Sequence, residues 1–347
     1  MSGLLEKKKF DKIRLDDPFF NSLKEDYPGF DVWFNKKKDE EAYITYENGE
    51  IQGFLYLKRE KGLLDDVTPV IEGEVILKIG TFKINPHGTR LGERFIKKAL
   101  DYALSIKAEL CYVTIFEKHT ALVLLLERYG FSRQGSKPSN NELVLVKNMK
   151  ILTGDILDDY PLINTKGNGK FLLSIYPQYH TNMFPDSILH TENLNILEDV
   201  SYTNSIHKVY VCRMKGVSEA ARGDVFAIYR TKTEGQNAEY TSVVSSICVV
   251  EEIRKQTSFT DFEQFFNYAT TYSIFDRKDL QYWYEKGGCF TIKMTYNAAL
   301  SKRLIRKKLI EEIGLDRNAY PGFVRLTDEQ FNRILKEGEV LEGIVVD

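Results

Sequence analysis

The chain has 347 residues, of which 43% are hydrophobic and 28% charged, and its formal net charge is -2. This composition is typical of a soluble globular protein, and the lack of a basic surplus excludes a nucleic-acid-binding surface that covers the whole molecule. The length exceeds that of a usual single core and predicts two domains.

The first residues, MSGLLEKKKF, carry charge where a secretion signal needs an apolar core, and the aliphatic run at 121–126 is too short to span a bilayer. Cys111, Cys212, Cys248 and Cys289 lie far apart without a CxxC pair. This spacing favours reduced thiols over a disulfide framework or a zinc site. We therefore expect a cytoplasmic protein without a bound metal.

Residues 41–59 contain two β-rich runs joined by Asn48-Gly49, a pair that tolerates the positive φ angles of a tight turn. The pattern predicts a hairpin. A third strand is predicted at 74–84, where it leads into the short polar loop 85–90.

Apolar residues then recur three and four apart over 93–107, which predicts an amphipathic helix lying on the sheet. A strand at 110–116 follows, then a helix at 120–129 that ends before Gly130, a residue suited to the left-handed C-terminal conformation. The first domain closes near Lys147.

The stretch 150–170 is rich in glycine, proline and aspartate and is typical of a linker. Beyond it the pattern changes to short strands, predicted at residues 171–176, 208–214, 225–231 and 242–250. Helices are predicted at residues 261–268, 297–313 and 327–336, the last with Thr327 as its cap. A small β-barrel decorated by helices is the simplest packing of these elements.

The strand-to-helix junction from Phe82 to Gly92 carries the most chemical information. A strand that stops at a glycine-bearing loop and opens a helix leaves unpaired N–H groups, which bind phosphate with help from the helix dipole. Gly88 and Gly92 would allow close approach of an anion, and His87 and Arg90 could add donors. A glycine-rich turn also occurs for steric reasons alone.

The order hairpin, strand, glycine-bearing loop, amphipathic helix, strand and helix, with Gly130-Phe131 closing it, resembles the GNAT acetyltransferase superfamily over residues 10–148. The family's loop pattern is Gln/Arg-x-x-Gly-x-Gly/Ala. Here His87 holds the first position, Arg90 replaces the central glycine and Gly92 keeps the last.

The resemblance implies a mixed, mostly antiparallel sheet flanked by helices and an acetyl-CoA site between the strand at 82–84 and its neighbour at 111–116. The implied cofactor-binding residues are Phe82, Lys83, Ile84, His87, Gly88, Thr89, Arg90, Leu91 and Gly92. The family's proton-donating tyrosine is replaced by Leu126.

Transfer to an amine needs one base and one acid. Glu74, near the start of the central strand, is our candidate base, or else a solvated strand-end carboxylate. His119 is a candidate proton donor or a helix N-cap. Tyr129 is a candidate replacement for the missing tyrosine, or else a core aromatic.

The second half resembles the PUA-like superfamily, most nearly its ASCH and EVE branches. The resemblance rests on the segments LLSIYP at 172–177 and GDVFAIYR at 223–230. It implies an α+β β-barrel and a role with RNA, since family members often bind RNA or modified nucleotides. We accordingly expect a GNAT domain at 1–150, a linker at 151–169 and a PUA-like domain at 170–347.

A basic cluster falls on the helix predicted at 297–313, close in sequence to several aromatic residues. Basic charge holds phosphates and aromatic rings stack bases, although a solvated helix face offset by Glu311 and Glu312 gives the same pattern. The cluster consists of Lys302, Arg303, Arg306, Lys307 and Lys308, and the aromatic residues are Tyr282, Trp283, Tyr284 and Phe290. The basic triplets at 7–9 and 36–38 are interpreted as plain surface.

The sequence thus predicts an acetyl-CoA-dependent N-acetyltransferase whose acceptor is an amine on RNA, aminoacyl-tRNA, a ribonucleoprotein or a protein. The alternative is a non-catalytic RNA-binding or regulatory protein with a degenerate acyl-CoA site. The sequence indicates neither the acceptor nor the oligomeric state.

Overall fold

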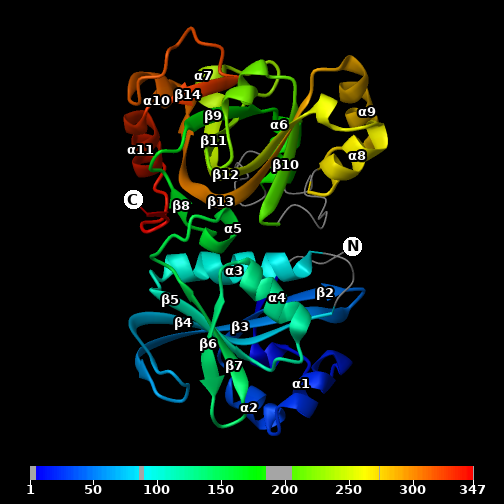
Figure 1. Cartoon of the computed structure of the whole chain (residues 1–347), viewed down its shortest axis with the longest axis vertical. Coiled ribbons are helices and arrows are strands. Elements are labelled where there is room, and N and C mark those ends of the chain that lie inside the picture. Colours follow the sequence, from blue (N-terminus) through cyan, green and yellow to red (C-terminus); the bar gives the residue numbers. More distant parts are fainter. Residues whose placement is uncertain (1–4, 86–89, 185–204, 273, 347) are drawn as a thin grey trace. The chain divides into compact units, whose positions relative to one another are not determined.

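The structure is a computed structural model that describes residues 5–85, 90–184, 205–272 and 274–346 (Figure 1). The chain divides into two compact units, the first ending at Met149 and the second beginning at Lys150. All four cysteines are free and buried. Among the described helices, none has both the length and the apolar character that crossing a bilayer requires.

The first unit is a seven-stranded sheet in the order β1-β2-β3-β4-β5-β7-β6, in which only β4 and β5 run parallel. This confirms the predicted mixed, mostly antiparallel sheet flanked by helices. Its elements are β1 (Glu6–Lys9), α1 (Asn21–Asp26), α2 (Phe30–Lys36), β2 (Glu41–Glu47), β3 (Glu50–Leu64), β4 (Ile71–Ile84), α3 (Leu91–Ser105), β5 (Leu110–Ile115), α4 (Thr120–Arg128), β6 (Ser132–Lys137) and β7 (Glu142–Asn148).

The two faces of this sheet are covered by different helices, as Figure 1 shows, with α3 and α4 on one side and α1 and α2 on the other. On α3 itself, the side chains of Phe95 and Leu100 are completely buried. Under α1 and α2, a cluster of aromatic rings forms the core, with Phe20 and Phe54 at its centre, their ring centroids 5.4 Å apart. Each face of the sheet therefore has a buried core under its helices, whereas β6 and the second half of β3 are largely exposed.

The predicted hairpin between β2 and β3 is confirmed. Its two turn residues, Asn48 and Gly49, have φ angles of 52° and 84°. Positive φ at both central positions matches the right-handed twist of the flanking strands.

The second unit has a six-stranded sheet in the order β10-β13-β12-β11-β9-β14, with β9 and β11 parallel. Within the described residues the two terminal strands, β10 and β14, do not pair with each other, so the sheet is open and no closed barrel forms. The elements are α5 (Ile156–Asp159), β8 (Ile163–Asn164), β9 (Lys170–Ile175), α6 (Pro177–Met183), β10 (His207–Cys212), β11 (Val225–Arg230), α7 (Ala238–Thr241), β12 (Val243–Lys255), α8 (Phe262–Thr270), α9 (Arg277–Lys286), β13 (Phe290–Ile305), α10 (Arg306–Glu311), β14 (Phe323–Leu326), α11 (Asp328–Glu337) and β15 (Val345–Val346).

The helix predicted at 297–313 is wrong. Most of that stretch belongs to β13, which pairs with both β10 and β12, and only its end forms the short helix α10. Helix propensity is a weak preference, and pairing on both edges of a buried strand overrides it. The sequence reading also missed α9, although Asp276 caps it by accepting a hydrogen bond from the Asp279 backbone at 2.7 Å.

Candidate functional site

The parallel strands β4 and β5 are paired over only part of their length. Their pairing ends where Ile79 lies opposite Val113, although β4 continues to Ile84 and β5 to Ile115. On its other side, β4 stays paired with β3 up to Ile84. The outer part of β4 therefore presents an open edge to the diverging end of β5.

A β-bulge marks the point where the two strands part. Tyr56 of β3 pairs with Thr81 and the next β3 residue pairs with Ile79, so Gly80 is an extra residue on β4. Bulges bend a strand and increase its twist. A Cβ on Gly80 would lie 2.7 Å from a ring carbon of Tyr56, so the close packing of this ring requires glycine.

A cavity of about 710 Å³ opens in this gap. Its walls include the end of β4 at Phe82, Lys83 and Ile84, the end of β5 at 113–115, and the first turns of α4. On the side of α1 and α2 the wall is formed by Ser22, Leu23, Asp26, Tyr27, Phe30 and Trp33.

The beginning of α3 packs against two residues of the cavity wall, Ile84 and Leu125, although no residue of α3 is itself in that wall. Three predicted loop residues, His87, Gly88 and Thr89, lie outside the described residues. Arg90 occupies the N-cap position of α3 without a side-chain capping bond, and Leu91 begins the helix as a buried residue. The first N–H groups of this 15-residue helix are the kind of donors that bind phosphate.

Gly92 has a packing reason for being glycine. A Cβ at this position would lie 2.6 Å from Cδ2 of Leu125 and 3.2 Å from Cδ1 of Ile84, and both of these residues line the cavity. The missing side chain lets α3 approach α4 and β4 closely. This adds a steric role to the anion-approach role predicted from the sequence.

His119 lines the cavity, at the N-cap position of α4. It forms no capping bond, and its Nε2 lies 2.9 Å from Oδ2 of Asp26. Lys118 also pairs with Asp26. Burial alone would raise the pKa of Asp26, but the hydrogen bonds from Lys118 and His119 outweigh burial and lower it.

Two of the predicted catalytic residues lie away from this cavity. Glu74 is exposed near the start of β4, and at about 3.3 Å per strand residue it lies roughly 20 Å before the bulge. Its backbone N–H donates to Oε2 of Glu109 at 3.1 Å. Tyr129 follows α4 and is completely buried. Neither Glu74 nor Tyr129 lines the described cavity, and their catalytic roles stay predictions.

The sequence reading missed a hydrogen-bonded pair in the cavity wall. The hydroxyl of Tyr27 donates to Oε1 of Glu142 at 2.6 Å, and both residues line the cavity. Burial is the main cause that raises the pKa of Tyr27, and its bond to Glu142 raises it further. No local pattern indicates this pair, because only the fold brings the end of α1 to the start of β7.

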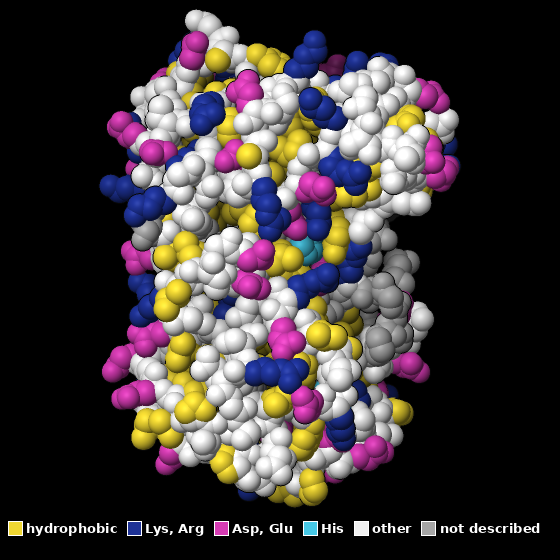
Figure 2. Space-filling model, in the orientation of Figure 1, with side chains coloured by type: hydrophobic (Ala, Val, Ile, Leu, Met, Phe, Trp, Pro, Cys, Tyr) yellow, Lys and Arg dark blue, Asp and Glu magenta, His cyan; other side chains and the backbone are white. Residues whose placement is uncertain are grey.

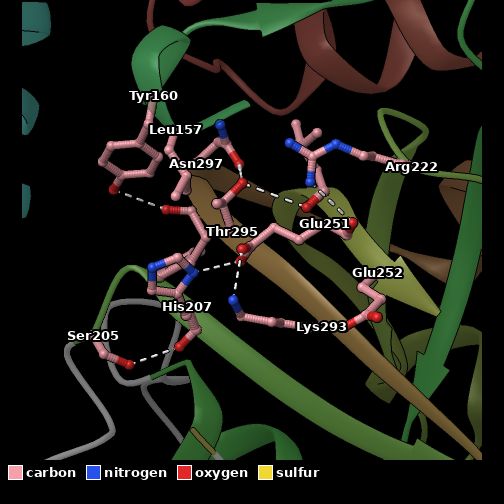
Figure 3. A network of polar contacts seen from close by, with 12 residues as sticks. Leu157, Tyr160, Ser205, His207, Arg222, Glu251, Glu252, Lys293, Thr295 and Asn297 are labelled. Carbon is pink, nitrogen blue, oxygen red and sulfur yellow. Dashed lines mark hydrogen bonds and ion pairs between the residues drawn. The ribbon is translucent and has the colours of Figure 1, made fainter. Parts of the chain in front are cut away.

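A separate polar group lies in the second unit (Figure 3). His207 hydrogen-bonds Glu251, and Nζ of Lys293 lies 2.9 Å from Oε2 of the same carboxylate. Burial raises the pKa of Glu251, but contacts with His207 and Lys293 outweigh it and the net pKa is lowered. Since these residues stand on β10, β12 and β13, the carboxylate ties three neighbouring strands together.

The basic cluster predicted on one helix is divided between two elements. Lys302 and Arg303 belong to β13, and the other three belong to α10. Lys308 pairs with Glu312 at 3.2 Å and with Glu337 at 2.7 Å, so part of its charge is offset. Figure 2 likewise shows acidic and basic side chains interspersed on the visible face.

Comparison with known proteins gives structural likeness only. The sequence matches no family model and no curated protein. Similar solved structures include the ASCH protein of Zymomonas mobilis, with 12% identity, 48% of this chain and 94% of that chain covered, and a TM-score of 0.34. They also include the N-acetyltransferase PseH of Campylobacter jejuni (12%, 42% and 98%, TM-score 0.28). A GNAT-family acetyltransferase of Streptococcus pneumoniae is similar too (14%, 42% and 97%, TM-score 0.31). Solved structures of both predicted kinds are thus similar to about half of the chain each.

Proposed function

We propose that the first unit is an acyl-CoA-dependent N-acyltransferase that uses acetyl-CoA as donor. The observation that carries this proposal is the parting of β4 and β5 at the Gly80 bulge, beside a cavity and the beginning of α3. A pantetheine arm is a chain of amides, and the open edge of β4 offers it the hydrogen bonds that a neighbouring strand would make. The diphosphate would lie at residues 87–92, on the first N–H groups of α3.

The chemistry asks for a positioned thioester, a neutral amine and a proton donor. Phe82, Lys83 and Ile84 would hold the donor through their backbone. His119, beside Asp26 in the cavity wall, is our candidate for contacting the donor. Backbone N–H groups at the bulge are suited to stabilise the oxyanion of the tetrahedral intermediate.

Ala121→Trp provides a sharp test of this placement, because Ala121 is exposed on the first turn of α4 and lines the cavity. The indole should fill the pantetheine channel and abolish acetyl-CoA binding measured by calorimetry. Leu124→Trp is the matched control, since Leu124 is 64% exposed on the same helix and does not line the cavity. Equal acetyl-CoA binding by both variants and the wild type would contradict the proposed site.

Turnover distinguishes an enzyme from a binding protein. Thiol release from acetyl-CoA should accelerate with at least one amine among free amino acids, a lysine peptide, a peptide N-terminus, spermidine and aminoacyl-tRNA. Binding without thiol release for any of these amines would favour the alternative, a regulatory protein with a degenerate site.

The second unit is proposed to present an RNA-linked acceptor. Three exposed tyrosines support this proposal: Tyr176, Tyr240 and Tyr320 have 51%, 55% and 78% of their surface exposed. Lys307 lies over the Tyr240 ring at 5.7 Å. Exposed rings beside basic charge are suited to stack unpaired bases and to contact phosphates.

The double change Tyr176→Ala and Tyr320→Ala should weaken tRNA binding about tenfold or more, since stacking contributes about 1–3 kcal/mol per base. Leu341→Ala is the control, because Leu341 is 43% exposed in the same unit and has no ring that could stack on a base. Wild-type affinity should also fall steeply with salt. A tRNA affinity that does not change with salt concentration, or no tRNA binding at all, would contradict the proposed role with RNA.

A further inference from the structure

The pair formed by Tyr27 and Glu142 is held rigidly in the cavity wall. Asn140 donates from Nδ2 to Oε2 of Glu142 at 3.0 Å, so each carboxylate oxygen has one bound donor. The Tyr27 ring lies against Phe116, with centroids 5.2 Å apart. Glu142 is only 3% exposed, yet its side chain borders the cavity. A buried carboxylate fixed at this opening is well placed to exchange protons with a bound molecule.

The pair also lies at the diverging end of the two strands. Glu142 directly precedes Leu143, which pairs with Ile115, the last residue of β5. On the other side of the gap, Lys83 near the end of β4 donates to the backbone oxygen of Phe19 and to Ser22. The segment from Phe19 to Tyr27 therefore crosses the gap between the ends of β4 and β5. This brings the Tyr27 hydroxyl to the side of β5.

In the other tyrosine–carboxylate pairs of the described part of this unit, only one of the two partners lines the cavity. Tyr56 lines the cavity, but its hydroxyl donates to Glu40, which does not. Glu60 lines the cavity, but its partner Tyr112 does not. Among the described residues, Tyr27 and Glu142 form the pair of this type in which both partners face the cavity.

We propose that Tyr27 and Glu142 are the proton-transfer residues of the acyl transfer, an inference that rests on the proposed function. The neutral amine attacks the thioester carbonyl, a C–N bond forms, and Glu142 takes the proton released by the new ammonium. The C–S bond then breaks, and the Tyr27 hydroxyl protonates the leaving thiolate.

The same pair closes the proton cycle without a further reactant. The protonated Glu142 returns its proton to the Tyr27 oxygen across their hydrogen bond. The net change moves one proton from the amine to the CoA thiol and regenerates both side chains. Burial, which raises the pKa of Tyr27, keeps its hydroxyl protonated before the reaction begins.

Tyr27→Phe and Glu142→Gln test this assignment. Phe keeps the ring against Phe116, and Gln keeps an oxygen acceptor for the Tyr27 hydroxyl. Each variant should lower kcat about 100-fold or more, as loss of a general acid or base does, with KM and acetyl-CoA affinity within about twofold of wild type. The matched control is Tyr268→Phe, which removes a hydroxyl bonded to Glu252 at 2.7 Å in the second unit and should leave kcat unchanged.

The outcomes separate this inference from the proposed function. If the wild type neither binds acetyl-CoA nor releases thiol, the transferase function itself fails. If the wild type turns over and both variants stay within threefold of its kcat, only the proton-transfer assignment fails. Loss of acetyl-CoA binding in both variants would also overturn it, because the pair would then be structural. A folding defect in one variant, seen by thermal melting, leaves the other to decide.

Discussion

Gly135 shows how one residue fixes the edge of the first sheet. Thr68 and Ser136 exchange two backbone hydrogen bonds, each 2.8 Å long, across an isolated bridge. A Cβ on Gly135 would lie 1.9 Å from the backbone oxygen of Thr68, so the bridge must open to admit any side chain.

Gly135→Ala should therefore destabilise the first unit by about 2 kcal/mol, within the range for overpacked sites. Urea unfolding followed by Trp33 fluorescence in a Trp283→Phe background measures this, because the chain has two tryptophans. Ser136→Ala is the control, since Ser136 is exposed on the same strand and its backbone keeps both hydrogen bonds of the bridge. A midpoint unchanged by Gly135→Ala would show that the strand edge adapts freely.

His180 predicts an acid-sensitive second unit. Burial, with smaller contributions from Arg230 and Arg303, lowers its pKa from 6.5 to about 3. Between these values the unfolded chain binds a proton that the folded chain does not. Stability should therefore fall as the pH drops below 6.5, by up to about 1.4 kcal/mol per pH unit.

His180→Gln should flatten this dependence. The slope of unfolding free energy against pH, followed through Trp283 in a Trp33→Phe background, gives the comparison between pH 6.5 and 5. Equal slopes in the two proteins would mean that His180 is protonated in the folded state.

Phe82, Lys83 and Ile84 could be singled out from the sequence, because the end of a strand before a glycine-bearing loop is visible there. The structure places all three in the cavity wall, and their role in binding the donor stays a prediction. Tyr27 and Glu142 could not be found, since their hydrogen bond joins positions separated by most of the first unit. Glu74 could be placed near the start of a strand, but the sequence does not show where β4 and β5 part, so its position relative to the cavity could not be predicted.

At the scale of single elements, local signals were reliable where the backbone itself requires a residue type. Asn48-Gly49 placed the first hairpin, and Thr327 placed the start of α11. The helix expected at 297–313 failed because β13 is specified by pairing with two distant strands. Such pairing leaves no signature within the segment.

Thr327 closes a capping box on α11, accepting a hydrogen bond from the Gln330 backbone at 3.1 Å while Gln330 reaches back to the cap. Thr327→Ala should cost about 1 kcal/mol of stability in the second unit. Urea unfolding monitored by Trp283 checks this loss. Thr233→Ala is the control, because Thr233 is exposed. Equal urea midpoints for the two variants would show that the cap does not contribute to stability.

At the scale of the whole molecule, the two units differ in what they are expected to bind. The acyl donor belongs to the first unit in our proposal, and the RNA-linked acceptor to the second. A ligand that binds only the folded state of one unit stabilises that unit and leaves the other unchanged, provided the units unfold independently. Trp33 and Trp283 report on the units separately.

The most direct test of the central claim is therefore urea unfolding of the full chain with and without acetyl-CoA, read through each tryptophan in turn. At a donor concentration of about 100 times Kd, the Trp33 transition should gain about 2.7 kcal/mol, and the Trp283 transition should not move. A Trp33 transition that stays in place at millimolar acetyl-CoA would contradict a donor site between β4 and β5.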